Sequence, residues 1–180
     1  IEPRLQALVE HGRRSGRLTA TSDPALAVSQ SDMSLVCVGT PGLPDGSPDR
    51  SHLLRAVEQL GSLLATKPAF HSVVVRSTVL PGTTEELVIP LLEKMSGKKA
   101  GIDFGVGYLP EFLREGSAIA DHDDPGTLVL AALDARTRSL LTALLAPLPL
   151  RPAIVDIRTA ETVKYVSNAW HALKVSFANE

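Results

Sequence analysis

Short apolar runs alternate with amphipathic stretches along most of this chain. The apolar runs are typical of buried parallel strands, and the amphipathic stretches repeat leucine or valine at helical steps. The clearest helix is predicted over 51–66, where the apolar stripe comprises Leu53, Leu54, Val57, Leu60, Leu63 and Leu64. Strands are predicted at 18–20, 33–38, 73–75, 102–106, 127–131 and 153–157, and further helices at 3–15, 24–28, 83–95 (kinked at Pro90), 135–145 and from 159 or 160 onward. This alternation predicts an α/β fold with a mainly parallel sheet and right-handed crossovers.

Composition narrows the class of protein. Apolar residues make up 44% of the chain and charged residues 21%, as in an ordinary globular domain. A net charge of -2 provides no general attraction for nucleic acid or an anionic membrane, and neither partner is expected. Cys37 is the single cysteine, which excludes an internal disulfide and a thiolate metal cluster and fits a reducing, cytoplasmic location. The chain begins without methionine and ends inside a predicted helix, so we expect a piece of a longer protein.

Polar groups follow three of the predicted strands. They are the segments 39–41 (Gly-Thr-Pro), 77–83 (Ser-Thr-Val-Leu-Pro-Gly-Thr) and 110–111 (Pro-Glu). The carboxyl ends of parallel strands meet at one rim, where α/β enzymes bind ligands. Hydroxyl and backbone N–H groups there suit the ribose and phosphates of a cofactor, although ordinary helix capping is an alternative for either loop alone. The Gly-x-Gly-x-x-Gly motif does not occur, so a dinucleotide is not held by the standard phosphate turn.

An acidic loop follows the third of these strand ends. Glu111 and Glu115 flank Arg114, four residues apart. If the loop takes one helical turn, the two acids share a face, and one can act as a base while the other orients it. The alternative is a solvated helix start with acids near its positive end.

The last helix has a polar stripe formed by Glu161, Lys164, Asn168 and His171. A solvated face with an intrahelical Glu–Lys pair is one explanation. Trp170 and its apolar neighbours instead indicate a buried helix, in which lysine and asparagine need partners or a ligand. His171 alone is interpreted as a packing histidine.

These motifs resemble those of the UDP-glucose/GDP-mannose dehydrogenase family. The resemblance rests on segments 75–83 (VRSTVLPGT), 110–119 (PEFLREGSAI) and 160–180 (AETVKY, Asn168 and KVSFANE), supported by 36–41 (VCVGTP). It covers the whole chain in the right order. Segments 73–83 and 96–107 are most similar to the GDP-mannose 6-dehydrogenase branch, which serves alginate synthesis.

The resemblance implies NAD-dependent oxidation of the C6 alcohol of a nucleotide sugar to the uronic acid, in two hydride transfers through an aldehyde and a cysteine-bound thioester. GDP-mannose is the leading substrate and UDP-glucose the alternative. The fold implied is an incomplete Rossmann-like sheet with flanking helices, followed by the start of a long central helix. Residues 1–158 then form the second part of the NAD-binding domain, without its first βαβ unit, and 159–180 begin the central substrate and dimerisation helix of a homodimer or higher oligomer.

The resemblance also assigns residues, with no metal among them. The nicotinamide side is lined by Thr40, Pro41, Ser77 and Thr78, with Glu111 also touching the cofactor. Four residues are implied in catalysis. Thr78 and Glu111 hold the water or proton path, and Lys164 and Asn168 stabilise negative charge on the reacting oxygen. The substrate contacts are Glu111, Phe112, Leu113, Arg114, Glu115, Lys164 and Asn168.

The chain departs from the family pattern in several places. Leu109 replaces an asparagine, which removes an amide from the expected rim. The glycine turn, the acid that binds the adenosine ribose, the nucleophilic cysteine and the second nucleotide-binding domain have no match here, and Cys37 is expected inside an apolar strand where a thiol is inert. The isolated chain is therefore expected to be inactive. A folded, non-catalytic remnant that binds nucleotide sugar weakly is an alternative of a different class. A β-hydroxyacid-type dehydrogenase is a third, but it lacks the Pro-Glu-Phe-Leu-Arg-Glu loop.

Overall fold

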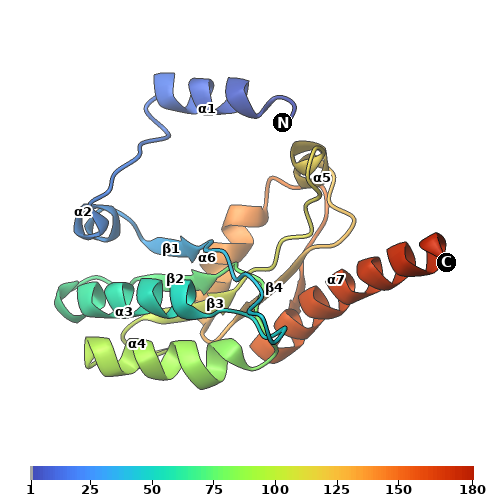
Figure 1. The fold of residues 1–180 in the computed structure, drawn as a ribbon. Coiled ribbons are helices and arrows are strands. Elements are labelled where there is room, and N and C mark those ends of the chain that lie inside the picture. Colours follow the sequence, from blue (N-terminus) through green and yellow to red (C-terminus); the bar gives the residue numbers. More distant parts are fainter. Residues whose placement is uncertain (1) are drawn as a thin grey trace.

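The core of the computed structural model is a five-stranded sheet in the order β1-β2-β3-β4-β5 (Figure 1). The structure describes residues 2–180, so Ile1, where the predicted first domain starts, lies outside it. Strands β1, β2 and β3 are parallel, β4 runs antiparallel to β3, and β5 is parallel to β4. Their bounds are β1 (Met33–Val36), β2 (Ser72–Val75), β3 (Gly105–Tyr108), β4 (Val129–Ala132) and β5 (Ala153–Val155).

The register aligns the carboxyl ends of the first three strands. Val36 pairs with Val75, and Val75 pairs with Tyr108. The loops that follow β1, β2 and β3 therefore leave the sheet at one edge, as the sequence predicts. This edge carries the candidate site.

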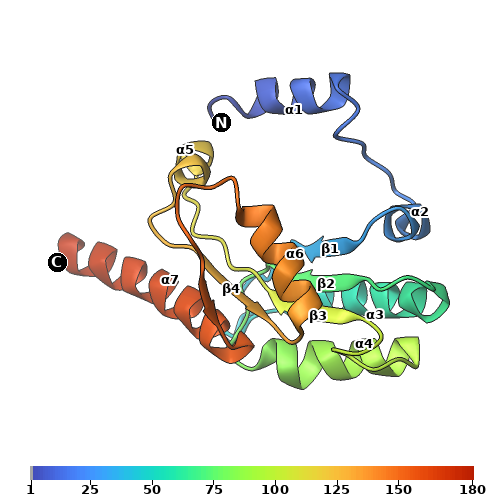
Figure 2. The ribbon, with the colours of Figure 1, turned by 180° about the vertical axis from the view of Figure 1, so that it is seen from behind.

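Helices cover both faces of the sheet (Figures 1 and 2). Side chains alternate between the faces, so Val73 and Val75 join α3 and α4 in the larger core cluster, whereas Val74 joins α6 in the smaller one. The helices are α1 (Leu5–Arg14), α2 (Pro24–Ser29), α3 (Ser51–Thr66), α4 (Ile89–Ser96), α5 (Ala118–Asp123), α6 (Ala135–Leu145) and α7 (Ile157–Asn179), with a π-helical turn, η1 (Thr84–Val88), directly before α4.

Two strand predictions are wrong. Residues 18–20 form no strand, since β1 has only β2 as a neighbour in the described sheet and the segment lies exposed away from it. The strand expected at 102–106 begins at Gly105, because 101–103 form a turn in which Gly101 takes a φ of +78°. The helix expected over 83–95 is divided differently: η1 precedes Pro90, which lies in the first turn of α4 where a missing N–H is tolerated.

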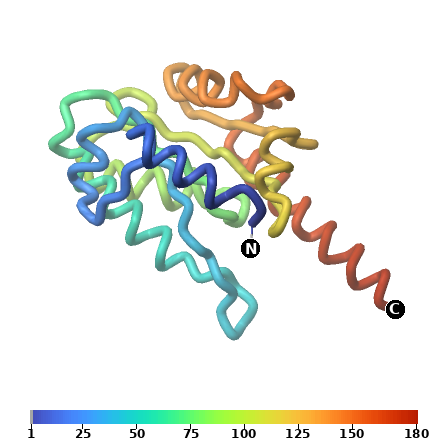
Figure 3. The backbone as a smooth tube through the Cα atoms, turned by 90° about the horizontal axis from the view of Figure 1, so that it is seen from above, coloured from blue at the N-terminus to red at the C-terminus, as the bar shows by residue number. Residues whose placement is uncertain are grey.

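Helix α7 begins at Ile157, two or three residues before the predicted start at 159 or 160, because the Asp156 carboxylate caps it by accepting from the Thr159 N–H at 2.8 Å. Its first turns pack against the sheet, and the rest projects away from the body (Figure 3). The expectation of a largely buried helix is wrong for this second part, where Trp170 is 57% exposed and Phe177 83% exposed. Within residues 2–180, no helix is long and apolar enough to cross a membrane.

Candidate active site

The loops after β1 and β2 are fastened side by side. The Ser77 hydroxyl donates to the Val38 carbonyl at 2.7 Å, and the Thr40 hydroxyl donates to the Thr78 carbonyl at 2.8 Å. Ser77 is buried, Thr78 is half-buried and Pro41 is exposed beside them. The predicted cofactor residues therefore do gather at one rim, but the hydroxyl groups of Thr40 and Ser77 hold the loops together.

The third loop joins this rim through β3. Tyr108 is fully buried, and its hydroxyl donates to the Ser77 carbonyl at 3.2 Å. Burial, and then the nearby charge of Glu161, raises the pKa of Tyr108, so its hydroxyl keeps the proton that it donates. All three strand ends are thus bonded into one continuous edge.

An ion pair between a buried lysine and a half-buried glutamate joins the third loop to α7. The Lys164 ammonium donates to Glu111 Oε1 at 2.9 Å, and the two side chains are 6% and 31% exposed. Burial by itself raises the pKa of Glu111, but the Lys164 ammonium, the Leu113 N–H and the charge of Arg76 together hold that pKa below its usual range. Glu111 is therefore a carboxylate at neutral pH, with a fixed cation beside it.

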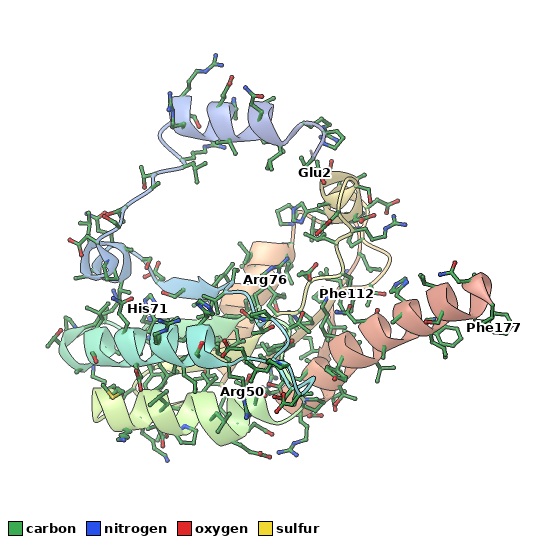
Figure 4. All side chains as sticks on the ribbon, viewed as in Figure 1. Glu2, Arg50, His71, Arg76, Phe112 and Phe177 are labelled. Carbon is green, nitrogen blue, oxygen red and sulfur yellow. The ribbon has the colours of Figure 1, made fainter. Side chains whose placement is uncertain are left out.

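Phe112 lies on the same pair. Its ring centroid is 5.5 Å from the Lys164 ammonium, close enough for a cation–π contact. Figure 4 shows Phe112 and Arg76 in the region between the sheet and α7, with Phe177 at the far end of that helix. An aromatic face and a carboxylate together fix where the lysine points.

The acidic loop is not helical, contrary to both expectations for it, since the next helix begins only at Ala118. Glu111 Oε2 accepts from the Leu113 N–H at 2.8 Å, a local bond that competes with a helical turn. Residues 109–114 are irregular and Glu115 is exposed, so Glu111 and Glu115 do not share a helix face. Leu113 is exposed as well.

Asp121, in helix α5, makes a contact with this loop that sequence reasoning missed. It accepts from the Arg114 guanidinium at 2.6 Å and from the Arg114 backbone N–H at 2.9 Å, and its side chain is 14% exposed. The hydrogen bonds from Arg114 hold the pKa of Asp121 far below its usual range. No spacing rule for helices or strands links Arg114, in the irregular segment, with Asp121 in α5. The Arg114 side chain is therefore held against α5.

The predicted polar stripe of α7 divides between buried and exposed positions. Glu161 and Lys164 are buried, whereas Asn168, one turn further, and His171 are exposed. His171 is therefore not a packing histidine. It lines a pocket of about 650 Å³ together with Arg76, Glu111, Phe112 and Arg114. A cavity of this size matches those that hold small ligands.

Leu109 and Cys37 also lie at this edge. Leu109 is 1% exposed, packs in the smaller core cluster and borders the pocket, so an apolar side chain stands where the family pattern has an asparagine. The expectation that Cys37 lies inside a strand is wrong, because β1 ends at Val36 and Cys37 is exposed. Among the described residues, no group of histidine, cysteine and acidic side chains could hold a metal ion.

A largely parallel sheet with this polar rim at its carboxyl edge defines a nucleotide-binding α/β domain. Residues 1–149 match the UDP-glucose/GDP-mannose dehydrogenase family, NAD binding domain. The chain is 48% identical over 180 residues to GDP-mannose 6-dehydrogenase of Pseudomonas aeruginosa, covering 100% of this chain and 41% of that protein. It is 40% identical to a UDP-glucose 6-dehydrogenase of Haloferax volcanii, covering 99% of this chain and 42% of that protein.

Solved structures agree. A ternary complex of GDP-mannose dehydrogenase from Pseudomonas aeruginosa superposes with a TM-score of 0.97 at 47% identity, and a UDP-glucose dehydrogenase from Pyrobaculum islandicum with 0.92 at 40%. Each match covers 99% of this chain and 41% of the other. The chain belongs to the UDP-glucose/GDP-mannose dehydrogenase family and contains its NAD-binding domain. It spans about 41% of the length of these relatives.

NAD is the cofactor of this domain, and the rim fits it. A Cβ added to Gly39 or Gly42 meets no atom within 4 Å, so the backbone after β1 is open to a ligand. The position beyond the carboxyl ends of parallel strands is where such domains bind nucleotides.

Proposed function

We propose that this chain is part of an enzyme that oxidises the C6 alcohol of a nucleotide sugar to the uronic acid with NAD, and that GDP-mannose is the substrate. The observation that carries the proposal is the buried Lys164–Glu111 pair beside the cofactor rim. The 48% identity to a GDP-mannose 6-dehydrogenase favours the choice of sugar nucleotide.

UDP-glucose is the second candidate. A relative with that substrate in its name is 40% identical, only modestly less than the GDP-mannose enzymes. Both candidates share the same oxidation at C6, so the residues of this chain carry the same chemistry in either case.

In this proposal Thr40, Pro41, Ser77 and Thr78 hold the nicotinamide end of NAD, which accepts the hydride when bound. The tied loops present backbone groups in a fixed arrangement. Fixed positions matter because a reacting pair held in line gains several kcal/mol, roughly 7 to 11 in favourable cases, over free encounter.

In this proposal, other residues accept the proton of the alcohol and stabilise the negative charge that develops on the sugar oxygen. Glu111, ionised and half-buried, accepts the proton of the alcohol or of a water held with Thr78. The Lys164 ammonium, with the Asn168 amide one turn along, stabilises negative charge on the sugar oxygen. A fixed cation aimed at such charge contributes on the order of 3 kcal/mol in a dry site.

The pocket that Glu111 and Phe112 line is assigned to the sugar nucleotide. Leu113, Arg114 and Glu115 continue the same loop. Since the Arg114 guanidinium already donates hydrogen bonds to Asp121, Arg114 contacts the substrate mainly through its backbone.

The proposal also divides the chain. Residues 1–158 are assigned to the NAD-binding domain without its first βαβ unit, which would pair with the free side of β1. Residues 159–180 are assigned to a central helix that contacts substrate and a second subunit, giving a homodimer or higher oligomer. The exposed apolar side chains along the end of α7 support this role.

The test is an assay of the full-length protein with NAD and either GDP-mannose or UDP-glucose. NADH formation with a stoichiometry of two per sugar, fastest with GDP-mannose, is expected. One NADH per sugar would refute the uronic acid as product. Oxidation of neither substrate would overturn the proposed function, and faster oxidation of UDP-glucose would select the second candidate.

A further inference from the structure

Helix α7 carries two buried charged side chains one turn apart, and they bind different loops. Lys164 is 4% exposed and reaches Glu111 after β3. Glu161 is 0% exposed and reaches the turn between β2 and η1. The catalytic lysine and the β2 loop are therefore linked through one short stretch of helix.

Glu161 accepts two hydrogen bonds, both from backbone N–H groups of the described residues. Its Oε2 accepts from Gly82 at 2.6 Å and its Oε1 accepts from Thr84 at 2.8 Å. Burying a carboxylate costs free energy unless both of its oxygens are well bonded, and short bonds from N–H to a charged acceptor meet that need. Gly82 adopts a φ of +93°, which only glycine takes readily. The turn is thus shaped to receive the carboxylate.

This turn is continuous with the proposed cofactor loop. The Leu80 carbonyl accepts from both the N–H and the hydroxyl of Thr83, at 3.1 and 2.6 Å. Thr78 lies only two residues before Leu80, and its carbonyl accepts a hydrogen bond from the Thr40 hydroxyl of the loop after β1. A shift of the turn at Gly82 would therefore move Thr78 relative to Lys164.

We propose that Glu161 is a positioning residue of the dehydrogenase, which sets the separation between the cofactor loop after β2 and Lys164. The inference rests on the proposed function. Glu161 does not touch the reacting atoms. It acts by fixing the turn 82–84 to the same face of α7 that carries the lysine.

The contact between α7 and this turn offers a matched control. Arg158 also joins them, with its guanidinium 3.2 Å from Glu85 and 2.7 Å from Glu86, but its side chain is 53% exposed. Removing the Arg158 side chain weakens the attachment of α7 but takes away neither hydrogen bond of Glu161. A role confined to holding the helix in place would make the two residues equivalent.

The experiment compares Glu161→Gln with Arg158→Ala in the full-length protein. Glutamine keeps the size of the side chain but turns an NH₂ donor toward one of the two N–H groups. We expect kcat to fall by about 10- to 100-fold in Glu161→Gln, because a displacement near 1 Å has effects of this order, with each KM changed less than threefold. Arg158→Ala should keep kcat within about twofold, since exposed ion pairs contribute little.

Amide hydrogen exchange supplies a second readout that needs no substrate. The Gly82 and Thr84 amides should be protected in the wild-type protein and exchange at least tenfold faster in Glu161→Gln, and Gly82→Ala, which strains the same turn, should lower kcat in the same way. A kcat in Glu161→Gln within twofold of wild type, or equal losses in Glu161→Gln and Arg158→Ala, would overturn the proposal. A wild-type protein that oxidises no nucleotide sugar would instead refute the proposed function. In that case, unchanged exchange of the Gly82 and Thr84 amides in Glu161→Gln would still overturn the positioning role of Glu161.

Discussion

At the scale of single residues, the Lys164–Glu111 pair carries the chemistry of the proposed function. Its members are 53 positions apart, on a helix and an irregular loop. Lys164 is buried and Glu111 half-buried, so removing one partner leaves the other charge uncompensated, which costs free energy. The pair is therefore both a structural contact and, in the proposed function, the source of the charge that the reaction uses.

The first prediction concerns this pair in the full-length protein. Lys164→Ala and Glu111→Gln should each lower kcat by about a hundredfold, because the first removes the cation and the second the base. Steady-state rates of NADH formation measure the effect. Lys94→Ala, an exposed lysine of α4, is the control and should retain the wild-type rate. Rates near wild type in either variant of the pair would refute the roles assigned here.

The second prediction concerns His71, which is fully buried between two polar partners. One ring nitrogen lies 2.9 Å from the Ser34 hydroxyl and the other 3.0 Å from the Ser31 carbonyl. Burial lowers the pKa of His71 below its ordinary value of 6.5. As the pH falls, His71 is protonated in the unfolded chain at a higher pH than in the folded protein. The stability that His71 contributes is therefore complete above about pH 6.5 and is lost as the pH falls toward the lowered value.

Thermal unfolding of the wild-type chain and of His71→Gln between neutral and mildly acidic pH tests this. The variant should be less stable at neutral pH, by on the order of 1 to 3 kcal/mol, because the Ser34 and Ser31 partners lose their bonds. The gap between the two proteins should narrow as the pH falls. A gap that stays constant or widens would contradict a lowered pKa.

At the scale of elements, the strongly periodic helices were predictable and the strand limits were not. The helices over 51–66 and 135–145 coincide with α3 and α6, since each has an apolar stripe with clear ends. Ile102 has a strand-like side chain, yet the turn after Gly101 leaves it 73% exposed. Local geometry there overrides propensity.

The site was predictable only where it depends on topology. Strand ends in a parallel sheet meet by necessity, so the rim formed by Thr40, Ser77 and Glu111 follows from the order of elements. The Arg114–Asp121 contact and the hold of Glu161 on Gly82 depend on how irregular loops fold in three dimensions. The periodicity of apolar and polar side chains along the sequence does not predict such contacts.

The third prediction tests how closely α6 packs on the sheet. A Cβ at Gly105 would collide with the Thr137 hydroxyl and lie 2.8 Å from the Ser72 hydroxyl, two groups that hydrogen-bond each other at 2.9 Å. Gly105→Ala should therefore lower the free energy of unfolding by about 1 to 3 kcal/mol, as overpacking does. Chemical denaturation measures it. Gly126→Ala is the control, because a Cβ there meets no atom within 4 Å; equal stabilities in the two variants would contradict the close approach.

At the scale of the whole molecule, the second half of α7 exposes a stripe of large apolar side chains. Val166, Trp170, Leu173 and Phe177 are each more than half exposed, and Val166 and Trp170 also border an apolar pocket on this helix. Contiguous apolar surface of this kind marks a place where other protein packs. In the proposed function, a second subunit contacts this part of α7.

The fourth prediction follows for the 180-residue chain expressed by itself. It should self-associate or precipitate as its concentration rises, because water is removed from the α7 surface when copies meet. Light scattering across a concentration series measures this, and Trp170→Lys should shift the onset to several-fold higher concentration. The control is Ile102→Lys, since Ile102 is 73% exposed against 57% for Trp170 but is an isolated apolar side chain in a turn. If both substitutions help equally, total exposed apolar area drives the association. A chain that stays monomeric at all concentrations would show that α7 does not require a partner.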